Sequence, residues 1–106
     1  MTEFGRTSLE NGSNGTDHGE ANVMMIGGGG VNGGVYNCDT PNWEAGAQFA
    51  RRDRYLSRKT DFRAIFAEIF ENHFGDDPSL FETIMPGYTI DSLDFPSDFT
   101  RLGLLA

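Results

Sequence analysis

The clearest periodic pattern in the chain lies between Asp61 and Phe74. Six apolar residues recur there at three- and four-residue spacing: Phe62, Ile65, Phe66, Ile69, Phe70 and Phe74. This spacing places them on one broad face of an α-helix. Thr60 or Asp61 can cap the helix start, because a short side-chain oxygen accepts a hydrogen bond from a free first-turn amide. The pattern predicts one main amphipathic helix over 61–74, with the phenylalanine stripe in the core.

Other positions around this helix set its limits. Glu68, Glu71 and Asn72 fall outside the apolar face. Gly75 suits a left-handed helix end, and Pro78 suits the first position of a second short helical turn that runs to Ile84. In the tail, residues 85–106, we expect a solvated loop that carries Asp91, Asp94 and Asp98, followed by an apolar end that packs on the core.

A second kind of pattern lies nearer the N-terminus. Asn22–Ile26 is a short apolar run without polar alternation, and four glycines follow it. Such a run suits a strand that is covered on both faces, as in a parallel sheet. The glycines Gly27–Gly30 could cradle a phosphate, but the ending of a P-loop is missing and no clear helix follows. A tight turn after the strand is therefore the favoured interpretation.

These patterns indicate an α/β chain of one domain at most, since it has only 106 residues. We divide it into a site loop, strand and glycine-rich turn (1–36), an irregular basic loop (37–59), the helix (60–75) and a tail (76–106). The basic loop carries Arg51, Arg52, Arg54, Arg58 and Lys59. This cluster is either a patch for anions or acidic partners or a solvated segment that neutralises acidic surroundings, and the second interpretation is favoured.

Composition and charge argue against several classes of function for this chain. The net charge of −8 argues against a general nucleic-acid binder, because phosphate contacts require a positive face. No run approaches the roughly 20 apolar residues of a membrane helix. A single cysteine, Cys38, cannot form an internal disulfide, and the first residues lack the apolar region of a signal peptide.

The candidate chemistry lies in the opening segment. Asp17 and His18 are adjacent and flanked by glycine, and a carboxylate with an imidazole suits a divalent metal ion. At least one further ligand is needed, and the local candidates are Glu3, Glu10 and Glu20. Arg6 could bind an oxyanion such as phosphate or sulfate through its planar guanidinium. The alternative is that His18 is a loop histidine held by hydrogen bonds.

A family resemblance rests on four segments in order: TEFGRT, GTDHGEAN, GGGGVNGGVY and TDFRAIFAEIF. They resemble the C-terminal part of a large bacterial family catalogued as domain of unknown function 1501, over nearly the whole chain. That family is similar to the alkaline phosphatase and sulfatase superfamily. The resemblance implies a partial three-layer α/β/α sandwich around a short, mostly parallel sheet. It also implies a periplasmic or extracellular location for the parent protein.

Two registers relate the chain to the metal site of this superfamily. In one, Asp17, His18 and Gly19 match its metal-binding Asp-His-Gly. In the other, which follows the order of elements better, residues 2–5 match that motif and His18 matches a later metal-binding histidine. Glu3 and Phe4 then replace the aspartate and the histidine, which implies a one-metal or degenerate site. The resemblance thus implies metal ligation by His18, with Asp17 and Glu3 as further ligands.

The superfamily's nucleophile lies upstream of the matching segment. We therefore expect the chain to contribute ligands for zinc, manganese or calcium to a composite phosphate- or sulfate-ester hydrolase site, and to be inactive alone. The expected partners are the N-terminal part of the same domain and a small anionic ester, with neither nucleic acid nor membrane. Exposed edges and apolar surface predict self-association. The alternative is a non-catalytic scaffold or interaction domain with a degenerate metal site.

Overall fold

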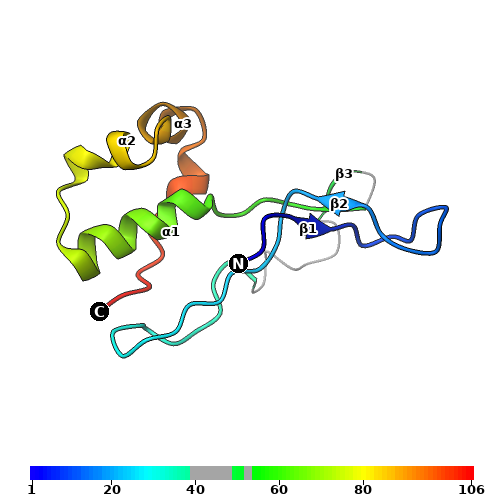
Figure 1. The fold of residues 1–106 in the computed structure, drawn as a ribbon, viewed down its shortest axis with the longest axis horizontal. Coiled ribbons are helices and arrows are strands. Elements are labelled where there is room, and N and C mark those ends of the chain that lie inside the picture. Colours follow the sequence, from blue (N-terminus) through cyan, green and yellow to red (C-terminus); the bar gives the residue numbers. More distant parts are fainter. Residues whose placement is uncertain (39–48, 52–53) are drawn as a thin grey trace. The chain divides into compact units, whose positions relative to one another are not determined.

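The computed structural model describes residues 1–38, 49–51 and 54–106, and the chain forms two compact units (Figure 1). The first unit consists of Met1–Ile26 and Asn37–Arg58, and the second of Gly27–Tyr36 and Lys59–Ala106. The elements of the first unit are short strands, and helices dominate the second. No helix in the described ranges combines the length and apolar character that crossing a bilayer requires.

The strands of the first unit form two separate pairs. β1 (Gly5–Arg6) pairs antiparallel with β2 (His18–Gly19), so that Gly5 lies opposite Gly19 and Arg6 lies opposite His18. β3 (Phe49–Arg51) pairs antiparallel with β4 (Tyr55–Leu56), with an irregular register. The polar loop with its Asn-Gly steps connects β1 to β2, as the sequence predicts for a turn-rich segment.

The predicted parallel sheet, and with it the three-layer sandwich, is wrong for this structure. Every strand pair among the described residues is antiparallel. Asn22–Ile26 is not a strand; Val23 is 64% exposed and Met25 is 89% exposed. A continuous apolar run shows that a segment is suited to being covered on both faces. It does not supply the neighbouring strands, and none of the described residues pairs with this run.

The main predicted helix is confirmed in the second unit. α1 (Phe62–Ile69) continues into a π-helical turn, η1 (Phe70–Phe74). Asp61 is the capping residue, since its side chain accepts a hydrogen bond from the Arg63 amide at 2.9 Å. Gly75 ends the helix with a φ of 74°, a left-handed conformation that glycine adopts without a Cβ clash. Local sequence signals therefore determine both ends.

Two further helical segments follow. The predicted turn from Pro78 to Ile84 is confirmed as η2 (Pro78–Leu80) and α2 (Phe81–Ile84). The sequence predicts a loop for the tail, but the tail contains α3 (Tyr88–Asp94) and η3 (Pro96–Phe99). Glu82 explains part of this difference, because its carboxylate accepts hydrogen bonds from the free first-turn amides at Gly87 (2.8 Å) and Thr89 (2.9 Å). The cap of α3 thus comes from α2 rather than from the residue before it.

The core of the second unit is small and lies between α1 and α2. Its buried members are Ala67, Phe81 and Met85, with Phe66, Phe70 and Tyr88 packed partly against them. None of the six residues of the predicted stripe is buried. Phe66 and Phe70 pack partly against this core, and Phe62 and Phe74 at the two ends of the stripe are exposed. Short helices leave few partners for the outer turns of α1 among the described residues.

An ion-pair group joins the start of α1 to α3. The Arg63 guanidinium lies 2.9 Å from a carboxylate oxygen of Asp61 and 2.6 Å from one of Asp91. It also lies over the ring of Phe99, at 5.1 Å from its centroid. Hydrogen bonds to Asp61 and then to Asp91 raise the pKa of the guanidinium above its ordinary value. Asp91 is thus part of a structural pair and not of a free acidic loop.

Glu68 is the unexpected residue of α1, because a residue outside the apolar face is 2% exposed. Its two carboxylate oxygens accept hydrogen bonds from the Leu102 and Leu105 amides, each at 3.2 Å. Buried carboxylates are tolerated when such partners replace water. Glu68 therefore fastens the C-terminal tail to α1.

The C-terminal tail also pairs with the glycine-rich turn. Val31 and Leu105 form an antiparallel bridge, and the Asn32 amide donates to the Leu104 carbonyl at 2.8 Å. The Ala106 amide donates to the Gly30 carbonyl at 3.0 Å. Leu104 is buried, so the predicted packing of the apolar end is confirmed. The turn at Gly27–Gly30 is held by this pairing.

Candidate functional site

The candidate site lies on the β1–β2 ribbon, which extends beyond its formal strands. The Thr7 amide donates to the Asp17 carbonyl at 3.1 Å, which continues the register one residue past Arg6 and His18. At the other end, the Asn22 side chain donates to the Thr2 carbonyl at 2.5 Å. The antiparallel register therefore relates residues 5–7 to residues 17–19, and beyond it a side-chain contact joins Asn22 to Thr2.

This register separates Asp17 from His18. Successive side chains of a strand point to opposite faces, so Asp17 and His18 lie on opposite faces of the ribbon. Thr7 pairs with Asp17 on one face, whereas Arg6 pairs with His18 on the other. Two adjacent residues in a ribbon cannot chelate one ion in the way that two residues of a loop can.

His18 packs on an aromatic neighbour. Its ring stacks on the Phe4 ring with centroids 3.7 Å apart and planes inclined by 22°. The Arg6 guanidinium lies over the same Phe4 ring, 5.5 Å from its centroid. His18 is exposed, and neither of its ring nitrogens hydrogen-bonds to a residue that the structure describes. Both nitrogens are therefore accessible to a ligand.

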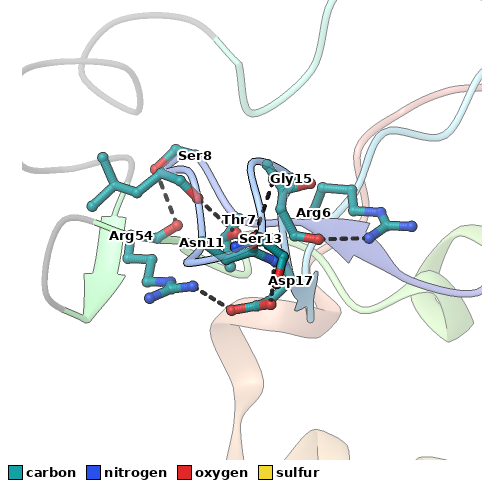
Figure 2. A network of polar contacts seen from close by, with 10 residues as sticks. Arg6, Thr7, Ser8, Asn11, Ser13, Gly15, Asp17 and Arg54 are labelled. Carbon is teal, nitrogen blue, oxygen red and sulfur yellow. Dashed lines mark hydrogen bonds and ion pairs between the residues drawn. The ribbon is translucent and has the colours of Figure 1, made fainter.

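Asp17, in contrast, is the centre of a polar network (Figure 2). One carboxylate oxygen accepts a hydrogen bond from the Asn11 amide nitrogen at 2.9 Å. The other forms an ion pair with the Arg54 guanidinium. The Asp17 backbone amide donates to the Thr7 hydroxyl at 3.1 Å. Both carboxylate oxygens thus have structural partners.

Asn11 organises the rest of the loop. Its side-chain oxygen accepts hydrogen bonds from the amides of Ser13 (2.9 Å) and Gly15 (3.1 Å). The Ser8 amide and hydroxyl both donate to the Arg54 carbonyl, at 2.9 and 3.0 Å. Figure 2 shows how these contacts tie the loop to Arg54. Nothing in the sequence marks Asn11 and Arg54 as partners of Asp17, because the Asn-Gly step at Asn11 indicates only a turn.

The predicted ligands are not brought together. Glu3 is exposed and precedes β1, whereas Asp17 lies at the opposite end of the β1–β2 pair, beside Thr7. Within residues 1–38, 49–51 and 54–106, no three His, Cys, Asp or Glu side chains are grouped to hold a metal ion. Metal ligation by His18, Asp17 and Glu3 remains a prediction for each residue taken singly.

Glu20 is the acidic candidate that follows β2 directly. It lies two residues after His18, at the bend where the strand ends. The Glu20 carboxylate lies 3.3 Å from the Arg58 guanidinium, in an exposed pair. Such a surface pair is weak and can be displaced.

Among the described residues, two arginines of the predicted basic cluster neutralise acidic side chains. Arg54 pairs with Asp17, and Arg58 pairs with Glu20. Arg52 and the side chain of Arg51 lie outside the described part of the chain. The interpretation as a segment that balances local acidic residues is therefore confirmed for the two arginines that the structure shows paired.

Arg6, the predicted anion-binding residue, is exposed beside His18. Its Nη1 donates to the Thr16 carbonyl at 2.7 Å, which fixes the guanidinium along the loop. The remaining N–H groups of a guanidinium can still meet an oxyanion. Anion binding by Arg6 stays a prediction.

Comparison with known proteins supplies one match. A family described as "Protein of unknown function (DUF1501)" matches residues 1–83 of the chain. No curated protein and no solved structure matches it. The matched range contains the whole β1–β2 ribbon and α1.

Proposed function

The chain belongs to the DUF1501 family, and from this premise we propose that the β1–β2 ribbon presents His18 as a metal ligand in a phosphate- or sulfate-ester hydrolase-type site. The observation that carries the proposal is the state of His18. The imidazole is exposed, its plane is held against Phe4, and its two nitrogens have no hydrogen-bond partner among the described residues. An exposed imidazole without a protein partner can bind a metal ion without first breaking a hydrogen bond within the fold.

The donor set of the ribbon fits a divalent ion only in part. An imidazole suits zinc or manganese better than calcium, which prefers oxygen ligands. Glu20, at the bend after β2, could add a carboxylate after leaving Arg58. Asp17 is occupied by Asn11 and Arg54 on the face opposite His18. The proposal therefore assigns the remaining ligands to residues outside the described ribbon, in the N-terminal part of the same domain.

The ribbon residues have distinct parts in this proposal. Phe4 fixes the plane of the His18 ring by stacking, so that the imidazole need not be ordered when it binds. Arg6, opposite His18, offers positive charge to a small anionic ester. When bound, the metal ion would supply Lewis acidity toward an ester oxygen. We also propose, from the family resemblance alone, that the parent protein is exported.

Calorimetric titration with zinc and with manganese tests the proposal. The full chain and the parent protein are compared with His18→Ala, and His73→Ala serves as a matched control because it removes the other histidine. We expect binding by the parent that His18→Ala weakens at least tenfold, about 1.4 kcal/mol. His73→Ala should bind like the unsubstituted protein. Equal binding by both variants of the parent would refute the assignment.

A second candidate function, a non-catalytic scaffold, is favoured by the Asp17 network. Both oxygens of its carboxylate are held by Asn11 and Arg54, as in a purely structural loop. On this alternative, the parent protein binds no divalent ion, and Asp17→Asn changes only stability. Metal analysis of the purified parent separates the two functions.

A further inference from the structure

Three Asn-Gly steps occur in the described chain: Asn11–Gly12, Asn14–Gly15 and Asn32–Gly33. Asparagine before glycine is chemically labile. The glycine amide nitrogen can attack the side-chain carbonyl carbon, because no side chain on the glycine hinders the approach. The attack needs an amide nitrogen free of hydrogen bonds and an asparagine side chain that can turn toward it. The three Asn-Gly steps differ both in whether the glycine amide is hydrogen-bonded and in whether the asparagine side chain can turn toward it.

The first two steps are blocked by the loop between β1 and β2. The Asn11 side chain makes three hydrogen bonds, to the Ser13 and Gly15 amides and to Asp17, so it cannot turn toward Gly12. For Asn14, the attacking nitrogen itself is engaged, since the Gly15 amide donates to the Asn11 side chain at 3.1 Å. One asparagine side chain thus protects both steps (Figure 2).

The third step is open. Asn32 and Gly33 are both exposed, and no described residue accepts a hydrogen bond from the Gly33 amide. The Asn32 side chain makes one hydrogen bond, from its amide nitrogen to the Gly103 carbonyl at 2.8 Å. Its side-chain oxygen is unbonded within the described residues, and an added Cβ at Gly33 would meet nothing within 4 Å. The Tyr36 hydroxyl donates to the Asn32 backbone carbonyl at 2.9 Å, and this bond leaves the Gly33 nitrogen unbonded among the described residues.

We propose that Asn32 is a spontaneous deamidation site, whereas Asn11 and Asn14 are protected by the folded loop. In the reaction the Gly33 nitrogen bonds to the side-chain carbon of Asn32, and the bond from that carbon to the amide nitrogen breaks. The proton of the Gly33 amide leaves with this nitrogen as ammonia, which yields a cyclic imide. Solvent water then opens the ring at either carbonyl, to aspartate or isoaspartate.

The modification would act on the C-terminal tail. The amide that donates to the Gly103 carbonyl becomes a carboxylate, and two oxygens then face each other at a distance suited to a hydrogen bond. Isoaspartate also lengthens the backbone beside the bond from the Asn32 amide to the Leu104 carbonyl. Both products weaken the pairing of the tail with residues 30–32.

Timed incubation of the full chain at mildly alkaline pH, followed by peptide mapping with mass spectrometry, tests the proposal. We expect deamidated Asn32 to accumulate several-fold faster than deamidated Asn11 or Asn14. In concentrated urea the three rates should converge, because only the fold distinguishes the three steps. Equal rates in the folded chain, or faster modification at Asn11 or Asn14, would overturn it.

A substitution checks the protection independently. Asn11→Ala frees the Gly15 amide and should raise the rate at Asn14 several-fold, with the rate at Asn32 unchanged. If this variant leaves Asn14 as stable as before, the protective role of Asn11 is wrong. The modified fraction, separated by charge, should show faster hydrogen exchange at the Ala106 amide. Asn32→Gln, which retains an amide and forms the imide far more slowly, is the matched control.

Discussion

At Gly5 the backbone of the segment that follows β2 approaches so closely that no side chain fits. A Cβ at this position would lie 1.8 Å from the Ala21 carbonyl oxygen. The obstacle is backbone, which cannot move aside as a flexible side chain can. Gly12, in the neighbouring loop, has nothing within 4 Å of the same position. The requirement for glycine at Gly5 is therefore steric.

Gly5→Ala should disrupt the ribbon that presents His18. Overpacking of this kind costs roughly 1–3 kcal/mol, and backbone contact places it at the upper end. Hydrogen exchange at the Thr7 amide, which bonds across the ribbon to Asp17, should accelerate. Gly12→Ala is the matched control and should leave that amide protected. Identical exchange in the two variants would show that the ribbon tolerates a side chain at Gly5.

Among the elements, α1 depends on a residue that its own pattern does not mark as core. Glu68 is buried because the C-terminal tail brings two backbone amides to its carboxylate. Removing the carboxylate would leave those amides without an acceptor. Glu71, three residues on, lies in an exposed pair with Arg101 at 2.8 Å.

Glu68→Ala is thus expected to destabilise the second unit. A buried amide left unsatisfied costs about 1–3 kcal/mol. Because the Leu102 and Leu105 amides are part-buried, we expect the loss of both hydrogen bonds together to fall within that range. Glu71→Ala, the control, should cost less than about 1 kcal/mol, as is usual for an exposed pair. Urea unfolding followed by circular dichroism measures both. A Glu68→Ala variant as stable as the control would contradict the role of Glu68 in fastening the C-terminal tail to α1.

The cap of α3 predicts a pH dependence. Hydrogen bonds from the Thr89 and Gly87 amides hold the pKa of the Glu82 carboxyl below its ordinary value, and the Ser79 amide does the same for Asp77. A lowered pKa in the folded state means that the unfolded state takes up protons first as the pH falls. These groups therefore stabilise the fold fully above the ordinary carboxyl pKa, and the contribution is lost as the pH falls through the lowered values.

Thermal melts, from neutral pH down through the pH range in which carboxyl groups titrate, test whether stability falls on acidification. The melting temperature should fall with pH, and Glu82→Gln should flatten the curve. The curve should not become flat, because Asp77 still contributes in this variant. A melting temperature that rises on acidification, or a Glu82→Gln curve parallel to the original, would count against the cap.

At the scale of the whole molecule, several large apolar side chains of the described residues are exposed. On α3 and just after it, Ile90, Leu93 and Phe95 are exposed, and Leu93 is 77% accessible. The first unit exposes Val23 and Met25. Large exposed apolar side chains promote association, whereas the net charge of −8 opposes it.

Self-association of the full chain should accordingly increase with protein concentration and with salt, which screens the charge. Sedimentation velocity measures the assembly state. Leu93→Ser should shift the distribution toward monomer, whereas Thr83→Ser, at an exposed polar position on α2, should not. A monomer at all concentrations and salt levels would exclude the prediction.

Local signals in the sequence were sufficient for some of this architecture. The cap at Asp61, the apolar spacing of α1, the left-handed end at Gly75 and the turn that begins at Pro78 involve residues within a few positions of one another. Their energetics depend on neighbours along the chain, so a pattern can indicate them. The ordered motifs likewise indicated the family, which the match over residues 1–83 shows.

Tertiary structure decided the rest, because it depends on pairings between distant residues. The ribbon register, and not adjacency in the chain, places Asp17 and His18 on opposite faces. Arg54, far along the chain, occupies the Asp17 carboxylate, and the C-terminal tail buries Glu68. Asn22–Ile26 has the composition of a covered strand but no pairing strand among the described residues. Composition determines what a segment can bury, and only long-range pairing determines whether it is buried.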